Sequence, residues 1–241
     1  MKKIINFVLL VSLSAFADNE IYVDQSGNTA SIDLEQLGSS NLIGGSSAVS
    51  GTMTALDLDG ISMTLDINQI GSNNLFRSDA IDGDNFTGFF EFDGDSNVMD
   101  ILLNSTGLIS ADYINLYLDV TGSSNEFDLK IAEDADSSYL DLDWTILGGS
   151  NEFDFDIDYA NAINFVDVNG SSNTINFTGS GYSGNTSSDS GYFYMDLDGS
   201  SNTFNIIQSS TLARDWLKIE TTTSNSNICI TQNDGGTATG C

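Results

Sequence analysis

The side chains of this chain that are best suited to chemistry are carboxylates. The 241 residues contain 35 Asp and Glu against 6 Lys and Arg, and they contain no His. Histidine is the most common general base and metal ligand, so its absence removes the usual means of catalysis near neutral pH. The sequence also has no Gly-x-Ser-x-Gly motif, no phosphate-binding glycine loop and no cysteine cluster. We therefore expect that the protein is not an enzyme.

Five of the carboxylates occupy one position relative to a recurring turn of the Gly-Ser-Ser-Asn type. They stand six residues before the Asn of the turn, at Glu35, Glu91, Asp119, Asp167 and Asp196. Hard cations prefer carboxylate oxygens, so these side chains are candidate ligands for weak Ca²⁺ bridging between repeats. The alternative is a solvated face that keeps the protein soluble. No other cofactor is expected.

Four aromatic residues share a second position, eight residues before the same Asn. They are Phe89, Tyr117, Phe165 and Tyr194, and we call them the aromatic strip. Aromatic side chains exposed on a flat sheet can stack on sugars or on another sheet, which makes the strip a candidate binding surface. The alternative is that surface loops cover these rings.

The turn itself recurs along most of the chain. Its clearest residues are Gly38, Asn41, Gly71, Asn74, Asn97, Asn125, Asn151, Asn173 and Asn202, and successive Asn residues are separated by 22 to 33 residues. Gly tolerates the positive φ that such a turn needs, and Asn also visits that region. Asn repeated at one position in stacked units can form an amide ladder. We expect these residues to line one edge of a repeat structure.

The residues on both sides of each turn alternate between apolar and polar. Of 35 positions with the inward parity around seven turns, 29 are apolar and none is charged. A period of two on both sides of a turn predicts two strands for each unit, with one face buried and one in water. One unit cannot bury its own apolar face, so the units must stack.

The sequence therefore predicts an all-β chain folded as a single β-solenoid. We expect about 7–8 rungs of strand, arc and strand, roughly 22–33 residues each. The insert at 44–60 contains the alternating segment 55–59, which predicts an extra half-rung. The expected divisions are a signal peptide at 1–17, repeats at 18–228 and a C-terminal tail or cap at 229–241. The two cysteines, Cys229 and Cys241, are predicted to form a disulfide that closes this tail.

At two turns the sequence resembles the curlin-repeat family, the subunits of curli-type bacterial fibres, which also has secreted and phage-encoded relatives. The resemblance lies in Gln-x-Gly-x-x-Asn, present here from Gln36 to Asn41 and from Gln69 to Asn74. It implies a β-solenoid that stacks end to end into amyloid-like fibres, as in a biofilm matrix.

Charge and the N-terminal segment set further expectations. Lys2 and Lys3, an apolar stretch and Ala15-Phe16-Ala17 are typical of an export signal, so we expect a secreted or surface protein cleaved near Ala17. Removing residues 1–17 changes the formal net charge from −29 to −31, which excludes a nucleic-acid binder. No later segment is apolar enough to span a membrane.

Two functions remain open at this stage. One is a structural subunit that associates with copies of itself. The other is a monomeric adhesin that binds a glycan or a cell surface.

Overall fold

The computed structural model describes ten stretches of the chain. These are residues 20–21, 23–38, 42–44, 56–71, 74–103, 113–131, 140–159, 162–181, 190–210 and 214–233. The predicted signal peptide 1–17, the turn residue Asn41 and Cys241 lie outside the described residues.

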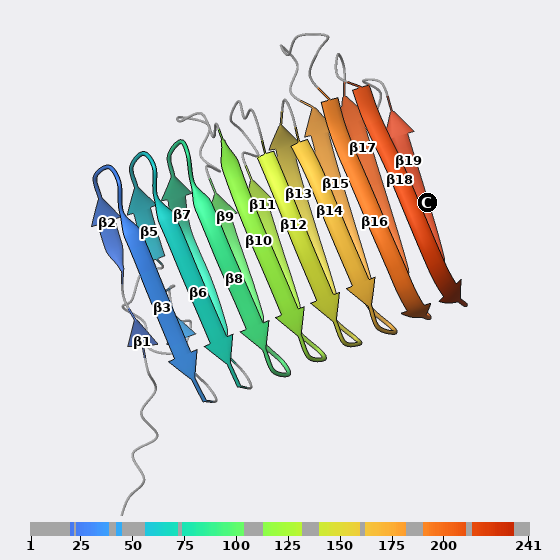
Figure 1. The fold of residues 1–241 in the computed structure, drawn as a ribbon, viewed down its shortest axis with the longest axis horizontal. Coiled ribbons are helices and arrows are strands. Elements are labelled where there is room, and N and C mark those ends of the chain that lie inside the picture. Colours follow the sequence, from blue (N-terminus) through green and yellow to red (C-terminus); the bar gives the residue numbers. More distant parts are fainter. Residues whose placement is uncertain are drawn as a thin grey trace, which may run out of the picture.

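All described regular structure is β-strand, arranged in two sheets that we name sheet A and sheet B (Figure 1). Sheet A contains β1 (Glu20–Ile21), β2 (Asp24–Ser26), β4 (Leu42–Ile43), β5 (Leu56–Asp59), β7 (Leu75–Asp82), β9 (Val98–Leu103), β11 (Glu126–Ile131), β13 (Glu152–Tyr159), β15 (Thr174–Gly181), β17 (Thr203–Ser210) and β19 (Asn227–Asn233). Sheet B contains β3 (Ser31–Leu37), β6 (Thr64–Ile70), β8 (Thr87–Asp93), β10 (Ile114–Thr121), β12 (Leu140–Leu147), β14 (Ala162–Asn169), β16 (Ser190–Ser200) and β18 (Arg214–Ser224).

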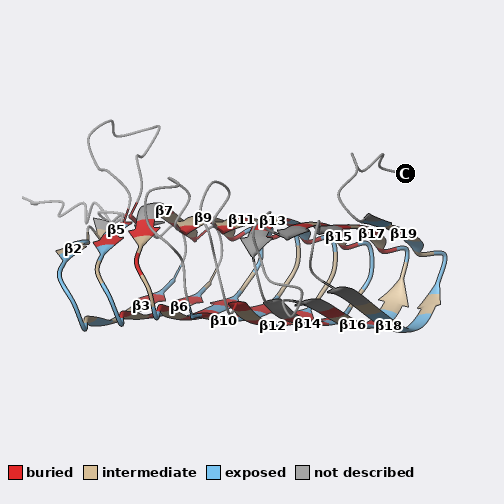
Figure 2. Ribbon diagram, turned by 90° about the horizontal axis from the view of Figure 1, so that it is seen from above, coloured by how far each residue is buried: buried red, intermediate tan, exposed pale blue. Residues whose placement is uncertain are grey.

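From β5 onward the chain alternates between the two sheets, and every pair among the described strands is parallel. In sheet B the order is β18-β16-β14-β12-β10-β8-β6-β3, so each strand lies beside its equivalent in the next repeat. The two sheets face each other as layers, with the buried residues between them (Figure 2). This confirms the predicted all-β solenoid.

The alternation in sequence decides which side chains enter the core. Along β10 the inward residues Leu116, Leu118 and Val120 are buried, and the intervening Tyr117 and Asp119 are exposed. Inward residues of successive strands are in register, so they form columns in the core, as in the stacked rings of Phe127 and Phe153 with centroids 4.9 Å apart. A one-residue slip of any strand would exchange its two faces.

The rungs are not uniform at the N-terminal end. Sheet A has eleven strands because three short ones, β1, β2 and β5, add to the regular series. The predicted half-rung is confirmed as β5, which pairs with β2 and β7. Two short strands here fill the place that one long strand fills elsewhere, since the insert after Gly44 interrupts the rung.

The predicted boundary between repeats and tail lies at 228/229. It falls inside β19, which pairs with β17 from Asn227 to Asn233. Ile228 and Ile230 keep the inward parity of this strand and continue columns of sheet A. The last repeat therefore lacks the turn motif but still forms both of its strands.

Candidate functional site

The turns from sheet B to sheet A form a continuous edge, which runs along the lower side of the rod in Figure 1. The first residue of the turns before the last repeat is a glycine, because a Cβ atom there would collide with the preceding turn. On Gly122, for example, it would strike the carbonyl oxygen of Gly94. Thr223 takes this position in the last turn. Gly38, Gly71 and Gly122 all have positive φ, and so do Ser124 and its equivalents at the third position. Although Asn tolerates a positive φ, in the described turns the residue before the Asn adopts it.

The turn Asn residues are buried, and they link each rung to the one before. The Oδ1 atom of Asn125 accepts a hydrogen bond of 2.7 Å from the backbone N–H of Asn97. The same bond recurs from Asn74 to Asn97, from Asn125 to Asn151, from Asn151 to Asn173 and from Asn173 to Asn202. In the later turns Nδ2 also donates to a glycine carbonyl, as from Asn173 to Gly148 at 2.9 Å. The ladder of turn Asn residues is therefore built from side chain to backbone, and no amide-to-amide hydrogen bond is observed between the described turn Asn residues.

Glutamine pairs supply the amide-to-amide contacts instead. Gln69 Nε2 donates to Gln36 Oε1 at 2.8 Å in the core of sheet B. In sheet A, Gln232 Nε2 donates to Gln208 Oε1 at 2.9 Å. The second pair was missed from the sequence because it lies outside the Gln-x-Gly-x-x-Asn motif, although the inward parity of Gln208 was a signal for it.

The five candidate Ca²⁺ ligands lie in one column on the outer face of sheet B. Asn68 and Thr145 interrupt this column, so Glu35 stands apart, Glu91 neighbours Asp119, and Asp167 neighbours Asp196. Ca²⁺ takes six to eight oxygen ligands. The described residues contain no group of three or more carboxylate or thiol side chains that could hold a metal ion. The geometry gives no support to metal bridging.

The aromatic strip forms a second column beside the first, in two pairs separated by Asp143. The rings of Phe89 and Tyr117 stack at 4.9 Å with an interplanar angle of 8°, and Phe165 and Tyr194 lie 6.0 Å apart. Phe89 and Tyr117 are each 40% exposed and Phe165 is 41% exposed, so these three rings are accessible to solvent.

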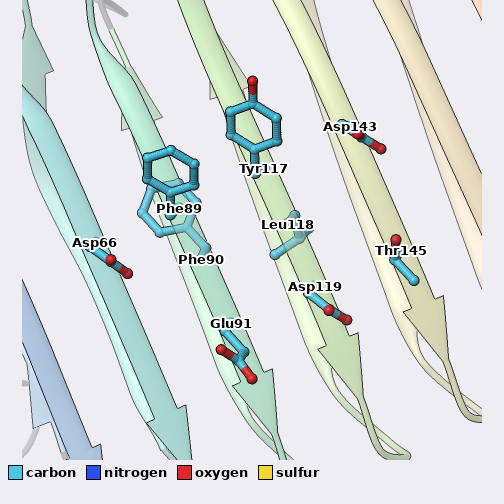
Figure 3. A pocket seen from close by; sticks show the side chains of 9 residues that line it. All are labelled: Asp66, Phe89, Phe90, Glu91, Tyr117, Leu118, Asp119, Asp143 and Thr145. Carbon is cyan, nitrogen blue, oxygen red and sulfur yellow. The ribbon is translucent and has the colours of Figure 1, made fainter.

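A groove of about 390 Å³ follows the first of these pairs, and we call it the aromatic groove (Figure 3). Its outward lining comes from four adjacent strands of sheet B and comprises Asp66, Phe89, Glu91, Tyr117, Asp119, Asp143 and Thr145. Burial raises the pKa of the Asp119 carboxyl above its ordinary value. Two exposed rings thus lie among four carboxylates, and the described lining includes no Lys or Arg.

At the C-terminal end of the same column, a ring and a carboxylate already have a cationic partner. The Nζ atom of Lys218 lies 4.8 Å from the ring centroid of Tyr194 and 3.1 Å from Oε1 of Glu220. The hydroxyl of Tyr194 donates to Glu220 Oε2 at 2.7 Å. This hydrogen bond and the nearby Lys218 lower the pKa of Glu220.

The outer face of sheet A has its own polar ladder, which no motif in the sequence predicted. Asn205 Nδ2 donates to Asn176 Oδ1 at 2.8 Å, and Asn176 Nδ2 donates to an oxygen of Asp154 at 2.6 Å. Cys229 lies next to Asn205 in this column and is disulfide-bonded. Its predicted partner, Cys241, is outside the described residues.

Comparison with known proteins adds no relative. No protein-family model, no curated protein and no solved structure matches this chain. Within the part of the chain that the structure describes, no helix is long and apolar enough to cross a membrane. The resemblance to the curlin repeats stays a prediction from the two motif copies.

Proposed function

We propose that the protein is an exported, non-enzymatic structural subunit whose rods associate end to end into an extracellular fibre or matrix. The observation that carries the proposal is where the core is incomplete. Among the described residues, the apolar side chains that pack on the core but are only partly buried lie in the terminal rungs: Ile21, Val23, Ala30, Ile32, Leu34, Leu217, Ile219 and Ile228. A second rod placed on either end would remove this apolar surface from water.

The backbone at the ends of sheet B supports the same association. Among the described strands, β3 pairs only with β6, and β18 pairs only with β16. An edge strand presents N–H and C=O groups to which another strand can add. Because all the strands are parallel, β3 of one copy can continue sheet B beyond β18 of another without reversing direction.

Polar residues at the two ends of sheet A also match. Gln25 at one end and Gln232 at the other occupy the same column, which runs through Leu58, Ile81, Leu103, Ile131, Ile157, Gly179 and Gln208. In both observed pairs the Gln of the later rung donates to the Gln of the earlier one. A second copy stacked in register would place its Gln25 next to Gln232 and extend this pattern.

Charge acts in both directions at such a contact. In-register stacking would place Lys218 opposite Asp33 of the next copy, but it would also place Glu220 opposite Glu35. The formal net charge of −29 makes rods repel one another at long range. We therefore expect association to depend on screening by salt.

A monomeric binding protein is the second candidate, and the exposure of the aromatic strip favours it. Three exposed aromatic rings in one column are unusual for a face that contacts only water. This function requires no contact between rod ends, so the same experiment distinguishes the two.

The test is light scattering of the purified protein across a NaCl titration. The Debye length falls from about 30 Å at 0.01 M to about 3 Å at 1 M salt. We predict a monomer at low ionic strength and end-to-end oligomers near 1 M. Ile230, which is 42% exposed on the terminal strand β19, is the residue to alter, and Ile230→Asp should abolish the association.

The matched control is Leu147→Asp, since Leu147 is 41% exposed on the interior strand β12. This variant adds the same charge at a similar exposure but away from the ends, so it should still associate. A protein that stays monomeric at every salt concentration contradicts the proposal, as does an equal effect of the two variants.

A further inference from the structure

The aromatic groove combines two surfaces that a single ligand chemistry satisfies. The stacked rings of Phe89 and Tyr117 offer apolar and π surface, and Asp66, Glu91, Asp119 and Asp143 surround them with carboxylates. We propose that this groove binds a lysine side chain of a partner protein, with the alkyl stem on the rings and the ammonium group among the carboxylates.

The molecule itself contains a filled example of this arrangement. On β18, Lys218 lies over the ring of Tyr194 and pairs with Glu220. Lys218 occupies the column position that Asp143 occupies on β12, beside Tyr117. The groove therefore presents rings and carboxylates of the kind that contact Lys218. At the position equivalent to Lys218, however, it has the carboxylate of Asp143.

The carboxyl group beside Lys218 and the one in the groove have pKa values shifted in opposite directions, as expected if only the first has a cation next to it. The pKa of Glu220 is lowered by the Tyr194 hydrogen bond and by Lys218, whereas the pKa of Asp119 is raised by burial. A cation in the groove would stabilise the charged form of Asp119, so binding should lower the pKa of this carboxyl.

The rings argue for an alkylammonium ligand over the other cations. Aromatic faces do not ligate Ca²⁺, which takes oxygen ligands, but they attract an ammonium group and cover an alkyl chain. Asp143 ends the apolar surface after two rings, which matches the short stem of a lysine better than an extended chain of amino sugars. Figure 3 shows Phe89 and Tyr117 next to each other, with Glu91 and Asp119 following them along the same strands.

The experiment titrates the protein with a short blocked peptide that contains one lysine. It is done at low ionic strength, where rods are expected to be monomeric, so its outcome does not depend on the proposed fibre. Chemical shifts of the Tyr117 ring and calorimetry report binding. Tyr117→Leu and Asp119→Asn should each weaken binding by about tenfold, a size typical of losing a cation–π or charge contact.

Two variants on β14, two strands along sheet B from β10, serve as matched controls. Phe165→Leu and Asp167→Asn make equivalent changes at the same column positions on β14, outside the groove lining, and should change the affinity less than twofold. The same peptide with acetylated lysine should not bind.

Three outcomes would overturn the proposal. Equal losses in groove and control variants would mean that net charge alone attracts the peptide. Binding of a glucosamine oligomer without binding of the peptide would assign the groove to a glycan. Titration without any shift of the Tyr117 ring would place the ligand elsewhere.

Discussion

The turns at the two edges of the rod share a backbone conformation, but different contacts of their side chains stabilise them. Gly94–Asn97 and its equivalents connect sheet B to sheet A, and three turns, 27–30, 60–63 and 83–86, connect sheet A to sheet B at the N-terminal end. Both series have a positive φ at the third residue, 64° at Ser96 and 62° at Ser62. In both, a Cβ atom on the first residue of one turn would strike the turn before it, as on Gly60 against Gly27.

The difference lies in the fourth residue. In the first series it is an Asn that is buried and hydrogen-bonded to the rung before. In the second series it is Ala30, Met63 or Phe86. Ala30 is half-buried against the core, and Met63 and Phe86 are each about 1% exposed. Backbone hydrogen bonds link successive turns at both edges, but the fourth side chain adds further hydrogen bonds at one edge and apolar packing at the other.

Replacing the packed residue should have the largest effect. We expect Phe86→Asn to cost about 3–5 kcal/mol of unfolding free energy, because a buried ring is lost and an amide enters its cavity. Asn85→Ser changes the exposed third residue of the same turn and should have little effect. Urea unfolding followed by circular dichroism measures both. A small loss for Phe86→Asn would mean that the amide can hold this edge as well, and the distinction would fail.

Removing the hydrogen-bonding residue should have the next largest effect. Asn173→Ala leaves the Asn151 N–H and the Gly148 carbonyl without their present partner, at about 1–3 kcal/mol for each buried group. Asn176→Ala, on the outer face of the following strand, removes hydrogen bonds that are closer to water and should cost less. The same unfolding assay applies. Equal losses of unfolding free energy in the two variants would show that burial of the turn Asn does not make its hydrogen bonds more costly to lose.

The smallest expected effect comes from the acids that precede the packed turns. Asp59 and Asp82 are neighbours in the column just before Gly60 and Gly83. Burial first, and then Asp59 and Asp57, raise the pKa of Asp82. The folded state thus binds a proton more readily than the unfolded state, so stability should rise as pH falls from 7 towards the raised pKa.

The matching variant is Asp82→Asn. It should raise the melting temperature at pH 7 and should lose this advantage at pH 4, where the native carboxyl is increasingly protonated. The pKa of Glu220 is lowered, so the folded state favours the charged form of this carboxyl. Glu220→Gln should therefore not stabilise the protein at pH 7. Thermal melts at the two pH values test this. A stabilisation by Asp82→Asn that is independent of pH would exclude the carboxylate as its cause.

Much of this architecture follows from the sequence because a strand repeats every two residues. That period placed Phe127 inside and Asp128 outside, and it brought Glu91 and Asp119 into one column. The edge formed by the turns from sheet B to sheet A was also predictable, because its Asn recurs in the sequence. The packed turns were not, since Ala30, Met63 and Phe86 share no motif that distinguishes them from other apolar residues.

The contents of the candidate site were predictable only in part. The exposed column of Phe89 and Tyr117 followed from parity, but the contact of Tyr194 with Lys218 did not. Variable links separate the last repeats, so the register of β18 on β16 could not be counted from the turn motif. Hydrogen bonds from Asn side chains to backbone depend on the close approach of neighbouring turns, which only the folded chain reveals.

The central claim, that rods stack end to end in register, is tested most directly by cross-linking two engineered cysteines. Glu35→Cys and Glu220→Cys change the like-charged residues that would lie opposite each other across the contact, about 4.8 Å apart at the usual strand spacing. This separation is within the range of a disulfide. Mixed at high salt under mild oxidation, the two variants should give a cross-linked dimer that contains one copy of each, identified by mass spectrometry, and neither variant alone should do so. No mixed dimer, or equal dimerisation of each variant alone, would contradict stacking of one end on the other.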